Sequence, residues 1–302
     1  MPAELVLRKS VSQKIEERSE RLHRDLGNPD PPISLDAIRE LLSLDKAFYS
    51  REDPGLLNKI VHKLKIAGLQ VLAQPTRLLT AWQKWDIKAL WVPDIRRIIL
   101  DESIPEKKKR WAETHEIGHS ILPWHQEFLQ GDPDSTLSVS CNAKIESEAN
   151  YAAGQILFPK RVFRETLPEI SQINMSAILK IAKSFGNSVT STLWRTVETL
   201  DVPSFGFICE NPCTSLPAFI TQNISVKEQP RHFFRSNSFA ERFSSITDDA
   251  IWNYLQSNCK PKKWKLLDTT VNIPANDQIY EEFHIETLNL THYAATFAIR
   301  HM

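Results

Sequence analysis

The sequence predicts an α+β protein: a small antiparallel sheet packed on a helix with a His-Glu-x-x-His motif and on a second helix with acidic side chains, then a helix-turn-helix-like pair and a C-terminal α/β module. Three strand-like runs with short connections predict the sheet, at 69–73, 89–92 and 96–100. Two helices with clear start and stop signals follow, at about 105–122 and 144–158.

Serine and proline residues set the ends of the predicted helices. Ser34 is the expected N-cap of a short helix with Ile38, Leu41 and Leu42 on one face. Ser103 is the expected N-cap of the helix at 105–122, and Pro123 ends it. The largely polar residues 124–142 are predicted to be a loop. Further helices are predicted at 9–26, 56–67, 176–184 and 188–200.

The pattern changes after Val202. Strand-like runs at 205–208, 219–221 and 283–290 surround one helical stretch near 247–256. They predict a separate α/β module of about 100 residues.

Composition and charge limit which class of protein the chain can belong to and in which compartment of the cell it is expected. Lys plus Arg equals Asp plus Glu at 37 each, so no overall field draws the chain to nucleic acid or to a membrane. No apolar run approaches the roughly 20 residues needed to span a bilayer, and the first 24 residues have no apolar core of a signal peptide. Four scattered cysteines give no disulfide framework. We therefore expect a cytoplasmic protein with no membrane partner.

The run His115-Glu116-Ile117-Gly118-His119 is the first candidate for chemistry. Residues at i and i+4 share a helix face, so His115 and His119 can present two imidazole nitrogens to one metal ion. Glu116 stands beside that line, within reach of a water molecule at the ion, as in zinc peptidases. The alternative is a surface helix with two unrelated histidines.

A catalytic zinc site needs a third protein ligand and an open position. The helix at 144–158 offers Glu146, Glu148 and Asn150. Glu146 and Asn150 share a face, so a ligating Glu146 with an orienting amide from Asn150 is expected. Glu148 lies roughly 160° from Asn150 around the helix and is predicted to be a solvated charge.

Two segments, 111–125 and 145–159, carry a family resemblance. The first is WAETHEIGHSILPWH and the second is IESEANYAAGQILFP, and together they resemble the ImmA/IrrE family of metallo-endopeptidases. The specific resemblance covers about residues 89–200. The sequence departs modestly from the family pattern: Thr114 precedes the first histidine, and Tyr151 stands one residue before the usual aromatic position, which Ala152 occupies.

The resemblance implies a role for each residue that matches the motif. His115, His119 and Glu146 would bind one Zn²⁺ per chain, and Glu116 would be the catalytic general base. Asn150 takes the small polar position after the third ligand. His125 and Tyr151 are candidates for outer contacts of the site or for stabilising the oxyanion, and a fourth protein ligand at His125 is disfavoured because it would close the site.

These features lead to a functional hypothesis with two rivals. The chain is expected to be a zinc endopeptidase that makes limited regulatory cuts in an intracellular protein, and the resemblance suggests a DNA-binding repressor or an antitoxin-like regulator as substrate. The rivals are a non-proteolytic, zinc-containing regulator and a DNA-binding protein with a vestigial peptidase. Between 160 and 198 six Lys/Arg stand against three Glu, a weak footprint for DNA, so the helical pair is expected to serve packing or docking.

These features predict four segments along the chain. Residues 1–32 form a polar lead segment and 33–165 the zinc metallopeptidase domain. Residues 166–201 form the helix-turn-helix-like subdomain, and 202–302 a C-terminal α/β module for sensing a ligand or docking the substrate.

Overall fold

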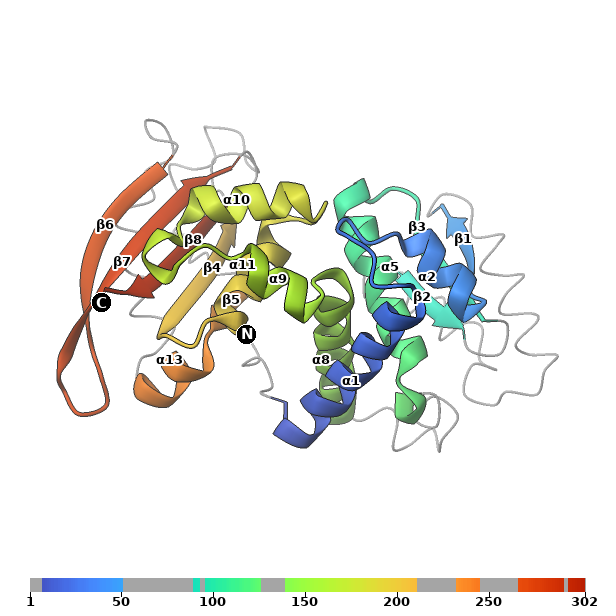
Figure 1. The fold of residues 1–302 in the computed structure, drawn as a ribbon, viewed down its shortest axis with the longest axis horizontal. Coiled ribbons are helices and arrows are strands. Elements are labelled where there is room, and N and C mark those ends of the chain that lie inside the picture. Colours follow the sequence, from blue (N-terminus) through green and yellow to red (C-terminus); the bar gives the residue numbers. More distant parts are fainter. Residues whose placement is uncertain are drawn as a thin grey trace, which may run out of the picture. The chain divides into compact units, whose positions relative to one another are not determined.

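A computed structural model describes residues 7–50, 89–92, 96–125, 139–210, 232–244, 266–290 and 293–301. The segments predicted at 56–67, 69–73, 219–221 and 247–256 lie outside the described residues. The chain divides into two compact units. The first holds Pro2–Phe163 with Phe185–Asn187, and the second holds Arg164–Ser184 with Ser188–Met302. Each unit combines helices with its own sheet, as the predicted α+β class requires (Figure 1).

The sheet of the first unit has three described strands in the order β1-β3-β2. β2 (Ala89–Val92) pairs antiparallel with β3 (Arg97–Asp101), which confirms the pairing predicted for 89–92 and 96–100. β1 (Asp45–Tyr49) was not predicted, and it pairs parallel with β3, so the sheet is mixed. Only Tyr49 of β1 is buried, which explains why this edge strand gives almost no hydrophobic pattern.

Helix α5 (Glu106–Ile121) lies between this sheet and helix α8 (Val139–Leu157) (Figure 1). Its N-cap position is Pro105, and the predicted cap Ser103 is wrong, because the Ser103 backbone N–H and hydroxyl both donate to Asp101 Oδ1. α8 begins within the segment 124–142, so the last residues of the predicted loop are helical.

Helix α1 (Lys9–Asp25) crosses α8. The prediction that residues 9–26 form a solvated helix is wrong for one face, because Ile15 and Leu22 are buried. Glu16 accepts hydrogen bonds from Tyr151 on α8 and from Lys160 at the start of α9 (Lys160–Thr166). α1 therefore belongs to the packed body of the first unit.

Helix α2 (Leu35–Leu42) follows the turn after α1. The Ser34 hydroxyl accepts from the Ala37 backbone N–H at 3.2 Å, which confirms the predicted N-cap. Ile38 is fully buried, whereas Leu41 is exposed, so the predicted apolar face is narrower than expected.

The second unit is built on a five-stranded sheet in the order β5-β4-β8-β7-β6, with every described pair antiparallel. The strands are β4 (Ser204–Glu210), β5 (His232–Arg235), β6 (Leu266–Pro274), β7 (Tyr280–Asn289) and β8 (Tyr293–Arg300). Helix α13 (Asn237–Arg242) covers one face, where Phe239 packs on Phe205 and Phe283. The buried Cys209 lies in the same apolar cluster as Phe239.

The helical pair after the short 3₁₀ turn η2 (Ile170–Gln172) packs on the other face of this sheet. It consists of α10 (Met175–Ser184) and α11 (Val189–Thr199). Ile178 of α10 and Leu193 of α11 share one buried cluster with Phe297 of β8. A Cβ on Gly206 of β4 would lie 3.1 Å from Leu193, so glycine allows the close approach of α11 to the sheet. The apolar faces of the pair are thus used for packing, the role expected from the sequence, and DNA binding by this pair stays the disfavoured alternative.

Among the described residues, no helix is both long and apolar enough to cross a membrane.

Candidate metal centre

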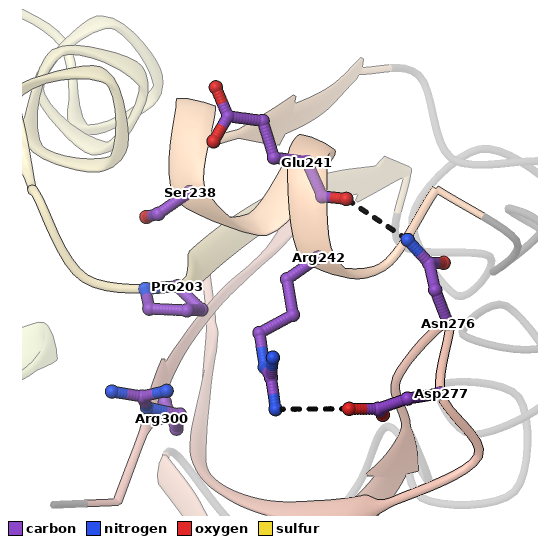
Figure 2. Close-up of a pocket in the computed structure, with 7 residues that line it drawn as sticks. All are labelled: Pro203, Ser238, Glu241, Arg242, Asn276, Asp277 and Arg300. Carbon is purple, nitrogen blue, oxygen red and sulfur yellow. Dashed lines mark hydrogen bonds and ion pairs between the residues drawn. The ribbon is translucent and has the colours of Figure 1, made fainter.

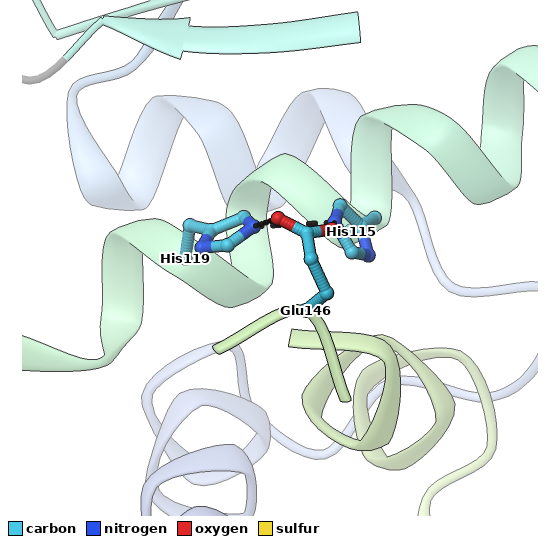
Figure 3. A group of neighbouring side chains, drawn as sticks. All are labelled: His115, His119 and Glu146. Carbon is cyan, nitrogen blue, oxygen red and sulfur yellow. Dashed lines mark hydrogen bonds and ion pairs between the residues drawn. The ribbon is translucent and has the colours of Figure 1, made fainter. Parts of the chain in front are cut away.

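Three potential ligands converge from two helices (Figure 3). α5 presents His115 and His119 one turn apart, and the Glu146 side chain reaches from α8 to lie between the two rings. The two Nε2 atoms lie 3.1 Å apart. Glu146 Oε2 is 3.0 Å from His115 Nε2, and Oε1 is 3.7 Å from His119 Nε2. The structure thus brings together the residues that the sequence proposed as ligands.

These distances fit a single zinc ion. Ligands about 2.0–2.1 Å from zinc in a tetrahedron are about 3.3 Å from one another. The observed separations of 3.0, 3.1 and 3.7 Å bracket that value. Two imidazoles and one carboxylate also form the ligand set of catalytic zinc, and the exposed side of Glu146 leaves room for a fourth, non-protein ligand.

The charges of the three groups are coupled. Burial and the charge of His115 lower the pKa of His119 to about 3, so His119 is neutral, the form that binds a metal. Burial opposes protonation of His115, but its hydrogen bond to Glu146 and the charges of Glu116 and Glu146 raise its pKa. Burial would raise the pKa of Glu146, yet the hydrogen bond and charge of His115 lower it. A cation at this point would replace the proton shared by His115 and Glu146.

Glu116 is buried beside the three ligands. Its Oε2 accepts a hydrogen bond from the Trp91 backbone N–H of β2 at 2.7 Å, so the edge strand fixes the carboxylate. Burial raises the pKa of Glu116 to about 7, the charge of His115 opposes this rise and Glu146 adds to it. A carboxylate with that pKa can both accept and release a proton near neutral pH.

The three remaining predicted residues, Asn150, His125 and Tyr151, have different hydrogen-bond partners. Asn150 Oδ1 lies 2.9 Å from His115 Nδ1, so its amide oxygen can orient that ring. His125 is fully buried, with Nδ1 2.9 Å from His119 Nδ1 and Nε2 3.1 Å from Glu148 Oε2. Tyr151 donates its hydroxyl proton to Glu16. The structure therefore places neither His125 nor Tyr151 with a free group for an oxyanion.

Glu148 is the residue whose role the sequence reasoning missed. It is 2% exposed, so its prediction as a solvated charge is wrong. Trp124 Nε1 donates to Glu148 Oε2 at 2.6 Å, and His125 Nε2 lies 3.1 Å from the same oxygen. Burial alone would raise the pKa of Glu148, but the hydrogen bonds from His125 and Trp124 lower it. The i, i+4 spacing was a usable signal, because it places Glu148 on one face of α8 with Ala152, which is fully buried.

Close contact of α5 with α8 depends on Gly118 inside the motif. A Cβ at this position would lie 2.9 Å from the Ala149 carbonyl oxygen and 3.2 Å from the Ala152 Cβ. The backbone carbonyl cannot move aside without moving α8, the helix that carries Glu146. Glycine is therefore required here for packing.

Gly118→Ala and Gly154→Ala should consequently have opposite effects on stability. At Gly118 an overpacking cost of about 1–3 kcal/mol exceeds the roughly 1 kcal/mol gained in helix propensity. At Gly154, in the same helix pair, a Cβ meets nothing within 4 Å, so alanine should stabilise by about 0.5–1 kcal/mol. Urea unfolding of both variants measures the difference, and equal stabilisation by both would contradict the close packing.

A second group of potential ligands lies on the sheet of the second unit. It consists of Asp268, His284 and Glu286. His284 Nε2 is 2.6 Å from Asp268 Oδ1, and Glu286 accepts from the Met175 backbone N–H at the start of α10. Glu286 therefore acts as a helix cap, and this group is already satisfied without a cation.

A pocket of about 460 Å³ also lies in the second unit (Figure 2). Its lining includes Arg242 and Arg300, and Figure 2 shows Arg242 directed at Asp277. Both arginines pair with Glu281 as well. Because both arginines already have acidic partners, neither is free to bind an anionic ligand in this pocket.

Two histidines one turn apart on a helix, a carboxylate from a second helix and a buried glutamate beside them form the arrangement that is typical of a metallopeptidase centre. Residues 62–196 match the model of a peptidase family described as IrrE N-terminal-like domain. Over these residues the chain is therefore similar to the metallopeptidase domains of the ImmA/IrrE family.

Individual relatives match over part of their length. The radiation response metalloprotease IrrE of Deinococcus radiodurans is 28% identical over 117 residues, which is 39% of this chain and 35% of that protein. This chain thus spans about a third of the length of that relative. A Mycobacterium tuberculosis transcriptional regulator superposes with a TM-score of 0.55 over 95% of this chain and 76% of its own, at 12% identity, and this likeness concerns the fold alone.

Proposed function

We propose that the protein is a zinc-dependent endopeptidase that makes limited cuts in a regulatory protein inside the cytoplasm. The observation that carries this proposal is the position of Glu116: a buried carboxylate with a pKa near neutrality, held by a backbone N–H beside three ligand groups at zinc-like separations. A purely structural zinc site needs no such base and is normally closed by a fourth protein ligand.

The residues divide the chemistry among them. His115, His119 and Glu146 would hold the zinc ion, which supplies Lewis acidity for the peptide carbonyl and the attacking water. Glu116 then acts as general base: it accepts the proton of the water molecule and passes it to the leaving amine. The Trp91 N–H holds one carboxylate oxygen of Glu116, so that the other can face the reacting water.

The substrate is expected to be a DNA-binding repressor or an antitoxin-like regulator. Support comes from the family and from the D. radiodurans relative, which is a metalloprotease of the radiation response. The second unit, with its own sheet and helices, would sense a signal or dock the substrate. A regulator that keeps zinc without cleaving, or that acts by binding DNA, remains the rival function.

Metal analysis combined with co-expression tests the proposal. The purified full-length protein should contain one zinc per chain, and repressors encoded next to it should be cut at a single position when both are expressed together. Chelation of the metal should stop the cleavage, and zinc should restore it. A protein that cuts in the presence of a strong chelator, or that contains no metal, is not the enzyme proposed here.

A further inference from the structure

A buried chain of hydrogen bonds leads away from one of the proposed ligands. It runs from His119 through His125 to Glu148, with contacts of 2.9 and 3.1 Å. His125 is fully buried and Glu148 is 2% exposed, so neither group faces solvent or a substrate. Nothing in the proposed hydrolysis uses these two side chains, yet burying an imidazole and a carboxylate costs free energy unless they are well paired.

The use of His119 Nε2 as the metal-binding atom determines where the protons lie along these hydrogen bonds. His119 Nε2 faces the cluster, 3.1 Å from His115 Nε2 and 3.7 Å from Glu146 Oε1, so it must be unprotonated to bind an ion. The proton of a neutral imidazole then sits on His119 Nδ1, which donates to Nδ1 of His125. His125 in turn carries its own proton on Nε2 and donates it to the Glu148 carboxylate. Every donor in the chain has an acceptor.

The local structure holds the middle of this chain in place. α5 ends before Pro123, and the His125 backbone N–H closes a turn by donating to the Leu122 carbonyl at 2.9 Å. Trp124 in this turn donates its indole N–H to the same oxygen of Glu148 that faces His125. The Arg18 guanidinium of α1 lies over the Trp124 ring, 5.7 Å from its centre.

We propose that His125 and Glu148 are positioning residues that fix His119 in the tautomer and orientation that bind the metal. Their effect is on metal affinity, and they touch neither substrate nor metal themselves. The inference rests on the proposed metallopeptidase function. His115 is held by the single amide oxygen of Asn150, whereas His119 is held by a histidine backed by a carboxylate. Outer contacts of this kind raise the basicity of a ligand and prevent its rotation.

Two amide substitutions separate the acceptor role of His125 from simple packing. The amide of asparagine occupies the position of Nδ1 and that of glutamine the position of Nε2. His125→Asn therefore keeps an acceptor for His119 Nδ1–H, whereas His125→Gln keeps contact with Glu148 and leaves His119 without an acceptor. His23→Gln is the matched control, because His23 is another buried histidine, and its Nε2 hydrogen-bonds to the Ile156 carbonyl at 3.0 Å, away from the proposed ligands.

The measurement is the dissociation constant of Zn²⁺ for each full-length protein, by competition with a chromophoric chelator, together with the visible spectrum of the Co²⁺ form. We expect His125→Gln to bind Zn²⁺ about 10–100-fold more weakly than the wild type and to alter the Co²⁺ spectrum. His125→Asn should stay within the same order of magnitude as the wild type, and His23→Gln should be unchanged. Urea unfolding of the metal-free forms shows that the variants are folded.

Several results would overturn the inference. Wild-type affinity in His125→Gln would mean that His119 needs no acceptor, and equal weakening in both amide variants would mean that the position of the acceptor is irrelevant. If His125→Gln does not fold, Glu148→Gln tests the same chain from its other end and should show a smaller loss of affinity; no loss would remove Glu148 from the role. A wild type that retains no zinc would instead refute the proposed function.

Discussion

Replacing Glu116 by glutamine should leave zinc bound at one ion per chain while slowing peptide hydrolysis by about 10²–10⁴-fold. Glutamine keeps the shape of the side chain and an oxygen that can accept the Trp91 N–H, so the ligands should stay where they are. Its amide cannot take a proton from water, which removes the general base. Burial raises the pKa of this carboxyl to about 7, so the glutamine variant loses the group placed to exchange a proton near neutral pH.

Glu116→Asp is the matched variant for this prediction. Aspartate keeps the carboxylate but withdraws it by one methylene, so its rate should lie between those of the wild type and the glutamine variant. Single-turnover cleavage of a fluorogenic substrate measures the rates, and metal analysis confirms loading. Wild-type cleavage by Glu116→Gln would show that another group is the base.

Loss of Glu146 should abolish both metal retention and activity. Removing an outer contact of a metal ligand costs about 10–100-fold in affinity, so removing a ligand itself in Glu146→Ala should cost more than about 100-fold. The two histidines would keep only part of the coordination, and His115 would lose the carboxylate at 3.0 Å that holds its Nε2.

Ser147→Ala is the control for Glu146→Ala. Ser147 is the next residue of α8, and its hydroxyl donates to the Lys144 carbonyl of the same helix. Zinc titration of both variants should show a large loss in the first and none in the second. If Glu146→Ala kept the affinity of the wild type, the third ligand would have to come from elsewhere and the centre as described would be wrong.

Much of the site could be predicted because its parts obey helix periodicity. His115 and His119 share a face of α5, and Glu146 and Asn150 share a face of α8, and both pairs follow from the i, i+4 spacing. Periodicity on one helix does not show what packs against its other side. Glu148 was therefore taken for a solvated residue, whereas the turn after α5 covers it.

The sheets were less predictable, because strand pairing depends on distant parts of the chain. Three of the eight residues of strand β8 are alanine, which is depleted in strands, yet β8 is the central strand between β4 and β7. Its residues are buried on both faces, so packing decides its conformation. Strand β1 pairs parallel with β3 across a separation of about fifty residues that no local pattern reveals.

The first helix determines the smallest fragment that should be produced for experiments. Ile15 of α1 lies in one buried cluster with Leu122 and Ala152, and Arg18 covers Trp124. A shortened chain that starts at Ile33 would expose this apolar surface to water and release the turn that carries Trp124. Truncation after residue 32 is therefore expected to weaken zinc retention, although no residue before this point is a proposed ligand.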